Sequence, residues 1–372
     1  MTICLGPESL TNPVILRQLP HKDFVTTLDV LCEQFLKSAQ RSRRVVAVCL
    51  NILATIPNKQ DNTKSSSVDD ILGVEDVLAI TDAERTALQQ HLQTLHTSTW
   101  SRMQQHISTM LDARSEIHSQ LQIDELKQVW DHCMDFVSVA GRIYNTKGML
   151  LLHTLLRQAR DSLEYLHKSQ LLMLQNLLHE ELWKPALVPS ALQNELTHLQ
   201  ENPRTAALLV RTSTTDVISA HPRLLIGSQS FCVTHSMLEF VKMLLHYLLY
   251  ARSFQGLGPE VMHRILELFR TFNTSSRSLV LNAGAVSQGF LKRISARHIA
   301  LVTQCLSAAM SLVTVAQTSL VLYLPSKQHP VLMQLSQGMI ELFADHRSQL
   351  FEKFPEIIKS VAEKSCSNLE VV

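Results

Sequence analysis

Glycine and proline are scarce in this chain, with 10 glycines and 12 prolines among 372 residues. Because both residue types interrupt regular helices, the segments between them are long. Leucine, glutamine and alanine, which favour helices, are plentiful in those segments. A chain of this length is also able to bury a sizeable core. We therefore predict an all-α protein, an elongated bundle of antiparallel helices with at most one small β-hairpin.

Apolar residues recur at helical spacing in several blocks along the chain. Residues 1–56 are predicted to form an N-terminal helical arm. The polar segment 57–70, rich in turn-forming residues, is expected to be a flexible linker. The first part of a helical bundle is expected at 71–203, and a C-terminal helical bundle at 204–372.

Local signals place individual elements within these blocks. Thr81 and Glu84 have the spacing of a capping box, which predicts that a helix starts there. Further helices are expected at about 123–144 and 148–183, before prolines break the pattern. Near 224–233, two short apolar runs are separated by a Gly-Ser step, which predicts the small hairpin.

The segment 299–324 carries no formal charge and is long enough to cross a bilayer. Polar residues recur in it at alternating spacings of three and four, which aligns them in one stripe on an α-helix. The stripe consists of Gln304, Ser307, Ser311, Thr314 and Thr318, and opposite it fall Leu301, Cys305, Ala308, Leu312 and Val315. A lipid-facing helix has no need of such a stripe, so a bundle helix is favoured over a transmembrane one.

The composition argues against several classes of protein. A formal net charge of +1 does not favour nucleic-acid binding, which usually shows a strong basic excess. The seven cysteines are scattered without a C-x-x-C pair, so neither a disulfide framework nor a zinc site is indicated. The first twenty residues lack the basic start and apolar run of a secretory signal, and we expect a cytosolic protein.

No motif indicates catalysis or a cofactor. Gly284 and Gly289 have the spacing of a phosphate loop, but Phe290 and Leu291 replace the lysine and the serine or threonine that it requires. None of the 17 histidines stands in an H-E-x-x-H arrangement, and no serine or cysteine lies in a nucleophile motif. We therefore expect no enzyme, no metal site and no cofactor.

The region 268–340 contains no acidic residue, whereas Arg270, Arg277, Lys292, Arg293, Arg297 and Lys327 are basic. Two interpretations remain open. The region is either a patch that attracts anionic lipid or an acidic partner, or it is neutralised by acidic side chains of neighbouring helices. Within one or two helical turns lie the residues of the candidate interaction surface, which are Lys292, Arg293, Arg297 and His298.

An ordered set of residues resembles a known family. The set is Gly148, Met149, Leu155, Gln158, Ala159, His167, Leu174, Glu181, Trp183, Lys184, Val188 and Pro189, with the glycine-centred segment 279–301 after it. In this spacing the chain resembles the C-terminal half of the vacuolar protein sorting-associated protein 54 family. Departures are Phe290, where the family has a glycine, and the apolar Leu171, Leu172 and Met173, where the family is more charged.

The resemblance implies a subunit of the Golgi-associated retrograde protein (GARP) complex, a vesicle tether of helical rods and coiled coils. Such a subunit acts in protein transport from endosomes to the trans-Golgi network, peripherally on the cytosolic face of these membranes. The implied partners are the other tethering-complex subunits and membrane-fusion (SNARE) proteins. The family's long N-terminal region has no counterpart here. Two other hypotheses stay open: a peripheral membrane-binding helical protein that uses 268–340, and an unrecognised hydrolase or transferase.

Overall fold

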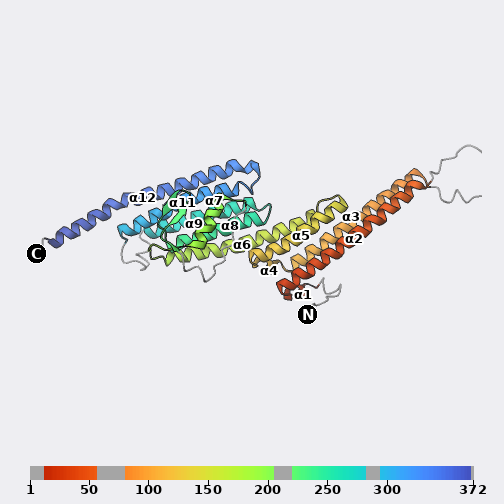
Figure 1. Cartoon of the computed structure of the whole chain (residues 1–372), viewed down its shortest axis with the longest axis horizontal. Helices are drawn as coiled ribbons and strands as arrows, with labels where there is room; N and C mark the ends of the chain where they lie inside the picture. Colours follow the sequence, from red (N-terminus) through yellow and green to blue (C-terminus); the bar gives the residue numbers. More distant parts are fainter. Residues whose placement is uncertain (1–11, 57–79, 205–219, 282–293, 370–372) are drawn as a thin grey trace, which may run out of the picture. The chain divides into compact units, whose positions relative to one another are not determined.

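The structure, a computed structural model, describes residues 12–56, 80–204, 220–281 and 294–369 (Figure 1). Its backbone is predominantly α-helical, which confirms the predicted all-α class. The chain divides into two compact units, Met1–Gln158 and Ala159–Val372. The linker expected at 57–70 lies outside the described residues, and the segment limits expected from the sequence stay predictions.

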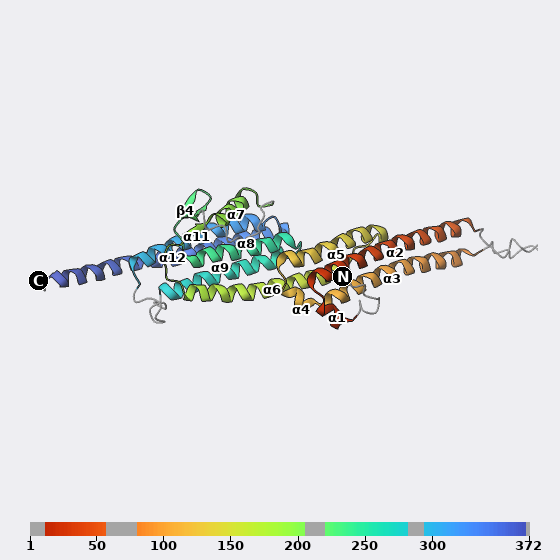
Figure 2. The same cartoon turned by 60° about the horizontal axis from the view of Figure 1, so that its bottom comes forward.

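The first unit is built on two long helices, α2 (His21–Thr55) and α3 (Asp82–Ala113), which pack against each other. Helix α5 (Ile123–Tyr144) packs against both of them, and both views show α2 and α3 reaching beyond its end (Figures 1 and 2). The remaining helices that start in this unit are α1 (Pro13–Gln18), α4 (Ser115–Ser119) and α6 (Met149–His179).

Helix α3 begins with the predicted capping box. The Thr81 hydroxyl accepts a hydrogen bond from the Glu84 backbone N–H at 3.2 Å, and the Glu84 carboxylate accepts one from the Thr81 N–H at 2.9 Å. Two backbone donors that the first helical turn leaves free are thereby satisfied. The helix expected at 123–144 is also present with those limits.

A buried arginine joins the start of the first unit to the end of α3. Arg114 is 1% exposed, and its guanidinium donates to the backbone carbonyls of Leu16 and Leu19, the latter at 2.7 Å. The same group lies 4.5 Å from the centre of the Phe24 ring, a cation–π contact. Carbonyl groups at the end of α1 thus take the place of a carboxylate, because helix C-termini carry partial negative charge. Burial lowers the pKa of Arg114.

The second unit contains the rest of α6 and the remaining elements. Helix α11 (Ala296–Leu320) packs against α12 (His329–Leu369), and α8 (His235–Ser253) packs against α9 (Gly258–Val280). Smaller elements complete it, namely β1 (Val188–Pro189), α7 (Ser190–Glu201), β2 (Ala220–His221), β3 (Leu224–Ile226), β4 (Gln229–Phe231) and the 3₁₀ turn η4 (Ser326–Gln328).

Helix α11 contains most of the uncharged segment 299–324. By length and composition alone it is the one helix among the described residues that is able to cross a membrane. In the structure it packs against α8, α9 and α12 and buries a continuous apolar face. This packing is that of the bundle helix that the sequence favoured.

The predicted hairpin is formed by β3 and β4, which pair antiparallel with Leu224 opposite Phe231 and Ile226 opposite Gln229. Gly227 in its turn has a φ of 59°, a left-handed conformation that glycine adopts without steric cost. A second antiparallel pair, which the sequence did not predict, joins β1 to β2. Each of these pairs involves only two or three residues per strand.

The Glu181 carboxylate links the end of α6 to the start of α8. One oxygen accepts from the Trp183 backbone N–H at 3.1 Å, and the other from the Ser236 N–H at 2.9 Å. The Ser236 N–H belongs to the first turn of α8, where an anion is favoured by the helix dipole. Trp183 is 1% exposed and has a φ of 50°, so the chain turns sharply at this anchored point.

Two glycines in helices of the second unit provide a matched pair. A methyl group at Gly258 would overlap the Tyr323 carbonyl, whereas one at Gly338 meets nothing within 4 Å. We expect Gly258→Ala to lower the free energy of unfolding by roughly 1–3 kcal/mol, because the backbones have to move apart. Gly338→Ala should raise it by about 0.5–1 kcal/mol through helix propensity. Urea unfolding measures both, and equal effects would contradict this packing.

Two buried histidines should make stability depend on pH. Burial lowers the pKa of His118 and of His346 to about 4, and each ring donates from Nδ1 to a side-chain oxygen, of Gln158 and Asn273 respectively. Unfolded histidine titrates near 6.5, so below that pH the unfolded chain binds more protons than the folded one. Stability should therefore fall between about pH 6.5 and 4, by up to roughly 3 kcal/mol per ring.

Thermal unfolding followed between pH 7.5 and 4.5 measures this loss. In the variants His118→Asn and His346→Asn, an amide N–H replaces the Nδ1 donor without a titrating group. On acidification, the unfolding temperature of each variant should fall by less than that of the wild type. A pH dependence that is the same in wild type and variants would show that other groups cause the acid sensitivity.

Candidate functional site

The polar stripe expected on α11 is present. Among its members, Gln304, Thr314 and Thr318 are exposed, and Ser307 and Ser311 are partly buried. On the opposite side, Leu301, Cys305, Ala308 and Leu312 are buried, and Val315 is partly buried. Helical spacing thus separated the two faces correctly.

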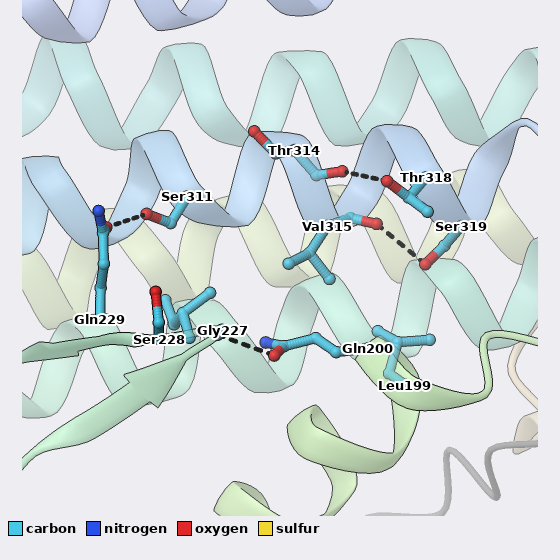
Figure 3. A pocket seen from close by; sticks show the side chains of 11 residues that line it. Leu199, Gln200, Gly227, Ser228, Gln229, Ser311, Thr314, Val315, Thr318 and Ser319 are labelled. Atoms are coloured by element: carbon cyan, nitrogen blue, oxygen red, sulfur yellow. Dashed lines mark hydrogen bonds between the residues drawn. The ribbon is translucent and has the colours of Figure 1, made fainter.

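The C-terminal part of this stripe, with Ser311, Thr314 and Thr318, forms one wall of a pocket of about 420 Å³ (Figure 3). The other walls are the end of α7 and the turn of the β3–β4 hairpin. The residues that line the pocket are Leu199, Gln200, Ile226, Gly227, Ser228, Gln229, Ser311, Thr314, Val315, Thr318 and Ser319.

Two glutamines of α7 hold the hairpin against the helix. The Gln193 amide accepts from the Leu225 backbone N–H at 2.9 Å and donates to the Leu225 carbonyl at 3.0 Å, as a neighbouring strand would. Seven residues later, on the same helix face, the Gln200 side-chain oxygen accepts from the Gly227 N–H at 2.9 Å. The α11 wall is joined to the hairpin by Ser311, whose hydroxyl donates to the Gln229 side-chain oxygen at 3.2 Å (Figure 3).

One buried donor remains free in this arrangement. The Gln200 side-chain nitrogen is inaccessible to solvent and has no hydrogen-bond partner among the described residues, while its oxygen is held by Gly227. A buried donor without a partner costs about 1–3 kcal/mol. Because solvent does not reach this nitrogen, an acceptor would pair with it only if the side chains around it moved.

The pocket can bind but is poorly equipped to react. The side chains that line it are aliphatic, hydroxyl or amide groups, and none of them is ionisable in the neutral range. The Thr318 and Ser319 hydroxyls donate to carbonyls of their own helix, at 3.0 and 2.9 Å (Figure 3). General acid–base catalysis needs a group that exchanges a proton near the working pH. The chemistry of this site therefore favours recognition of an uncharged, hydrogen-bonding surface.

The candidate interaction surface lies elsewhere and is only partly described. Lys292 and Arg293 are outside the described residues. Arg297 is exposed in the first turn of α11. His298 is partly buried and caps the helix, because its Nδ1 accepts from the Ser295 N–H at 3.2 Å while its own N–H donates to the Ser295 hydroxyl. Burial, and then the nearby Arg297, lower the pKa of His298. Neither residue lines the pocket.

In the basic, acid-free region, some basic residues are neutralised by a neighbouring helix and others are exposed. Arg277 donates to the Gln349 side-chain oxygen at 2.6 Å and lies 3.7 Å from the Asp345 carboxylate on α12, so a neighbouring helix neutralises it. Arg270 and Lys327 are exposed. Within the described parts of the chain, no three His, Cys, Asp or Glu side chains gather closely enough to hold a metal ion.

Sequence reasoning did not identify the α7 glutamines or the pocket. Gln193 and Gln200 are two helical turns apart, a spacing that puts them on one face. That spacing does not say which distant segment the face meets. Only the α11 stripe carried a local signal that pointed to this site.

Comparison with known proteins links this part of the chain to a family. Residues 228–360 match a family model described as Vps54-like protein. The chain is 25% identical to vacuolar protein sorting-associated protein 54 of Homo sapiens over 321 residues, which are 84% of this chain and 32% of that protein. It is 25% identical to the Mus musculus protein of that name over 236 residues, 63% of this chain and 24% of that protein.

A more distant relative is the Arabidopsis thaliana protein named vacuolar protein sorting-associated protein 54, chloroplastic. Identity to it is 21% over 318 residues, 67% of this chain and 31% of that protein. The chain thus spans 24–32% of the length of these relatives. No solved structure matches the chain. The chain therefore carries a Vps54-like domain at residues 228–360, and over most of its length it is similar to the vacuolar protein sorting-associated protein 54 family.

Proposed function

We propose that this chain acts in vacuolar protein sorting as part of a subunit of the GARP vesicle-tethering complex. In this function it helps to capture endosome-derived carriers at the trans-Golgi network, on the cytosolic face of the membrane. Its partners are other tethering-complex subunits and SNARE proteins. It works through contact surfaces and is not an enzyme.

The proposal rests on one observation, the coincidence of the Vps54-like match with a site suited to recognition. The match at 228–360 includes the hairpin residues Ser228 and Gln229 and the whole α11 wall of the pocket. A pocket lined by aliphatic, hydroxyl and amide groups suits contact with a polypeptide. The likeness to the named relatives supports the tethering role.

A pocket-filling variant tests the proposal. Val315 points from α11 into the pocket, and Val315→Phe would occupy part of that space (Figure 3). The tagged full chain is purified from cells, and the co-purified tethering-complex subunits are quantified by mass spectrometry. The wild type should recover them, and Val315→Phe should reduce their recovery at least about fivefold, because a partner group no longer fits.

Gln304→Phe is the matched control. Gln304 belongs to the same polar stripe of α11 but does not line the pocket, so recovery should stay at the wild-type level. Circular dichroism and the unfolding temperature establish that both variants are folded. If the wild type recovered no tethering-complex subunits, the proposal that this chain belongs to the complex would be refuted. Equal recovery by wild type and Val315→Phe would show that the pocket is not the contact.

A second candidate is direct membrane binding through the region 268–340. It is favoured by Arg270, Arg297 and Lys327, which are exposed, and each basic residue near an anionic membrane contributes about 1 kcal/mol. In liposome flotation, binding should require anionic lipid. It should also disappear when Lys292, Arg293 and Arg297 are replaced by glutamate. Equal flotation with neutral and with anionic liposomes would argue against this function.

A further inference from the structure

The first unit exposes a group of large apolar side chains on α2 and α3. Each of them is between 46% and 61% exposed. The group, named here the α2–α3 patch, consists of Val45, Val48, Ile52, Leu88 and Leu95. Contiguous exposed apolar surface is costly in water and commonly marks an interaction site.

The contacts between the two helices bring these residues together. Arg85 on α3 donates to the Ile56 carbonyl at the end of α2, at 2.7 Å. Farther along, the ring centres of Phe35 and His106 are 6.2 Å apart. These two contacts fix an antiparallel register, which sets Leu88 beside Ile52 and Leu95 beside Val45. The patch is therefore continuous across both helices.

The patch lies on the face of the helix pair that α5 does not cover. Trp100 on α3 stacks on Tyr144 of α5, and Asp29 on α2 lies 3.3 Å from His132 of α5. At 3.6 residues per turn, Leu95 stands roughly 140° around α3 from Trp100, and Val45 roughly 160° around α2 from Asp29. Helix α5 thus lies on a different face of the pair from the apolar stripes, and it ends before α2 and α3 do (Figure 2).

Positive charge adjoins one end of the patch. Arg41 continues the stripe of Val45 on α2, and Arg102 continues that of Leu95 on α3. Both arginines are exposed, and neither has a carboxylate within ion-pair distance among the described residues. No acidic residue occurs at 34–56 on α2 or at 85–111 on α3. The nearest acidic residues of the pair, Glu33 on α2 and Asp112 on α3, are therefore at least two helical turns along each helix from these two groups.

We propose that the α2–α3 patch binds an amphipathic helix of a partner protein, with acidic residues beside its apolar stripe. The patch and its arginines extend over about 15 residues of α3, or roughly 22 Å, which a partner helix of four turns covers. Such a helix would pack across α2 and α3, mostly beyond the end of α5. Its apolar residues pack between the two stripes, and its carboxylates pair with Arg41 and Arg102.

Helix α5 shows that α2 and α3 pack against an amphipathic helix. It carries acidic residues, including Asp124, Glu125, Asp131 and Asp135, and it packs on a different face of α2 and α3 from the patch. The proposal does not rest on the pocket, because the patch lies on other elements than those that line it and outside the Vps54-like match at 228–360.

A designed peptide serves as the probe. It is a fluorescein-labelled helical peptide of about 21 residues, with leucine at heptad positions a and d and glutamate on both sides of that stripe. A second peptide has lysine in place of every glutamate. Binding of each to the full chain is measured by fluorescence anisotropy. The glutamate peptide should bind, and the lysine peptide should bind at least about tenfold more weakly.

Charge reversal separates this surface from nonspecific attraction. In the double variant Arg41→Glu with Arg102→Glu, binding of the glutamate peptide should weaken at least about tenfold, and binding of the lysine peptide should be restored. Arg43→Glu is the matched control, because Arg43 is also exposed but lies roughly 200° around α2 from Arg41. It should leave both affinities unchanged. Circular dichroism confirms that each variant is folded.

Three results would overturn the proposal. The first is absence of binding by the glutamate peptide. The second is an equal loss in Arg43→Glu and in the double variant. The third is flotation of the chain with phosphatidylcholine–phosphatidylserine vesicles that requires Arg41 and Arg102, without peptide binding, which would assign the surface to lipid.

Discussion

The burial of one apolar face by each long helix is the constraint on which the rest of the structure depends. On α11 the buried face includes Leu301, Cys305 and Leu312, so the hydroxyl and amide side chains of the polar stripe point the other way. Their position along one wall of the pocket is a consequence of that packing. On α2 and α3 a similar division leaves apolar side chains outside the core, where no helix of the described chain covers them. The pocket and the α2–α3 patch therefore both result from how the helices pack.

Buried polar side chains determine where the helices end and how the segments between them run. The Arg114 guanidinium donates to the backbone carbonyl of Leu19, just after α1. The Glu181 carboxylate accepts from backbone N–H groups before and at the start of α8. Such groups are expensive to bury unless they are paired, so each holds its segment in one position. Gln193 and Gln200 act in the same way on the β3–β4 hairpin. The pocket exists because these amides hold the turn opposite α11.

The chemistry of the described surfaces is that of recognition. The pocket offers amide and hydroxyl groups among aliphatic ones, and the α2–α3 patch offers leucine and valine next to arginine. Neither brings together an acid and a base, which general acid–base catalysis requires. The two surfaces differ in the partner that they suit, since the first favours an uncharged segment and the second an acidic helix.

The sequence by itself determined the elements whose signals are local. Helical spacing predicted the helix at 123–144 and the two faces of α11, the pair Thr81 and Glu84 predicted a helix start, and the Gly-Ser step predicted the hairpin turn. These signals work because hydrogen bonds and side-chain periodicity within a helix or a tight turn act over a few residues. Tertiary structure alone decided that Gln200, Gly227 and Val315 share a pocket, that Arg114 meets Leu19, and that Asp345 neutralises Arg277. Those contacts join residues far apart in the chain, and they depend on which helix faces pack together, which spacing within one segment does not encode.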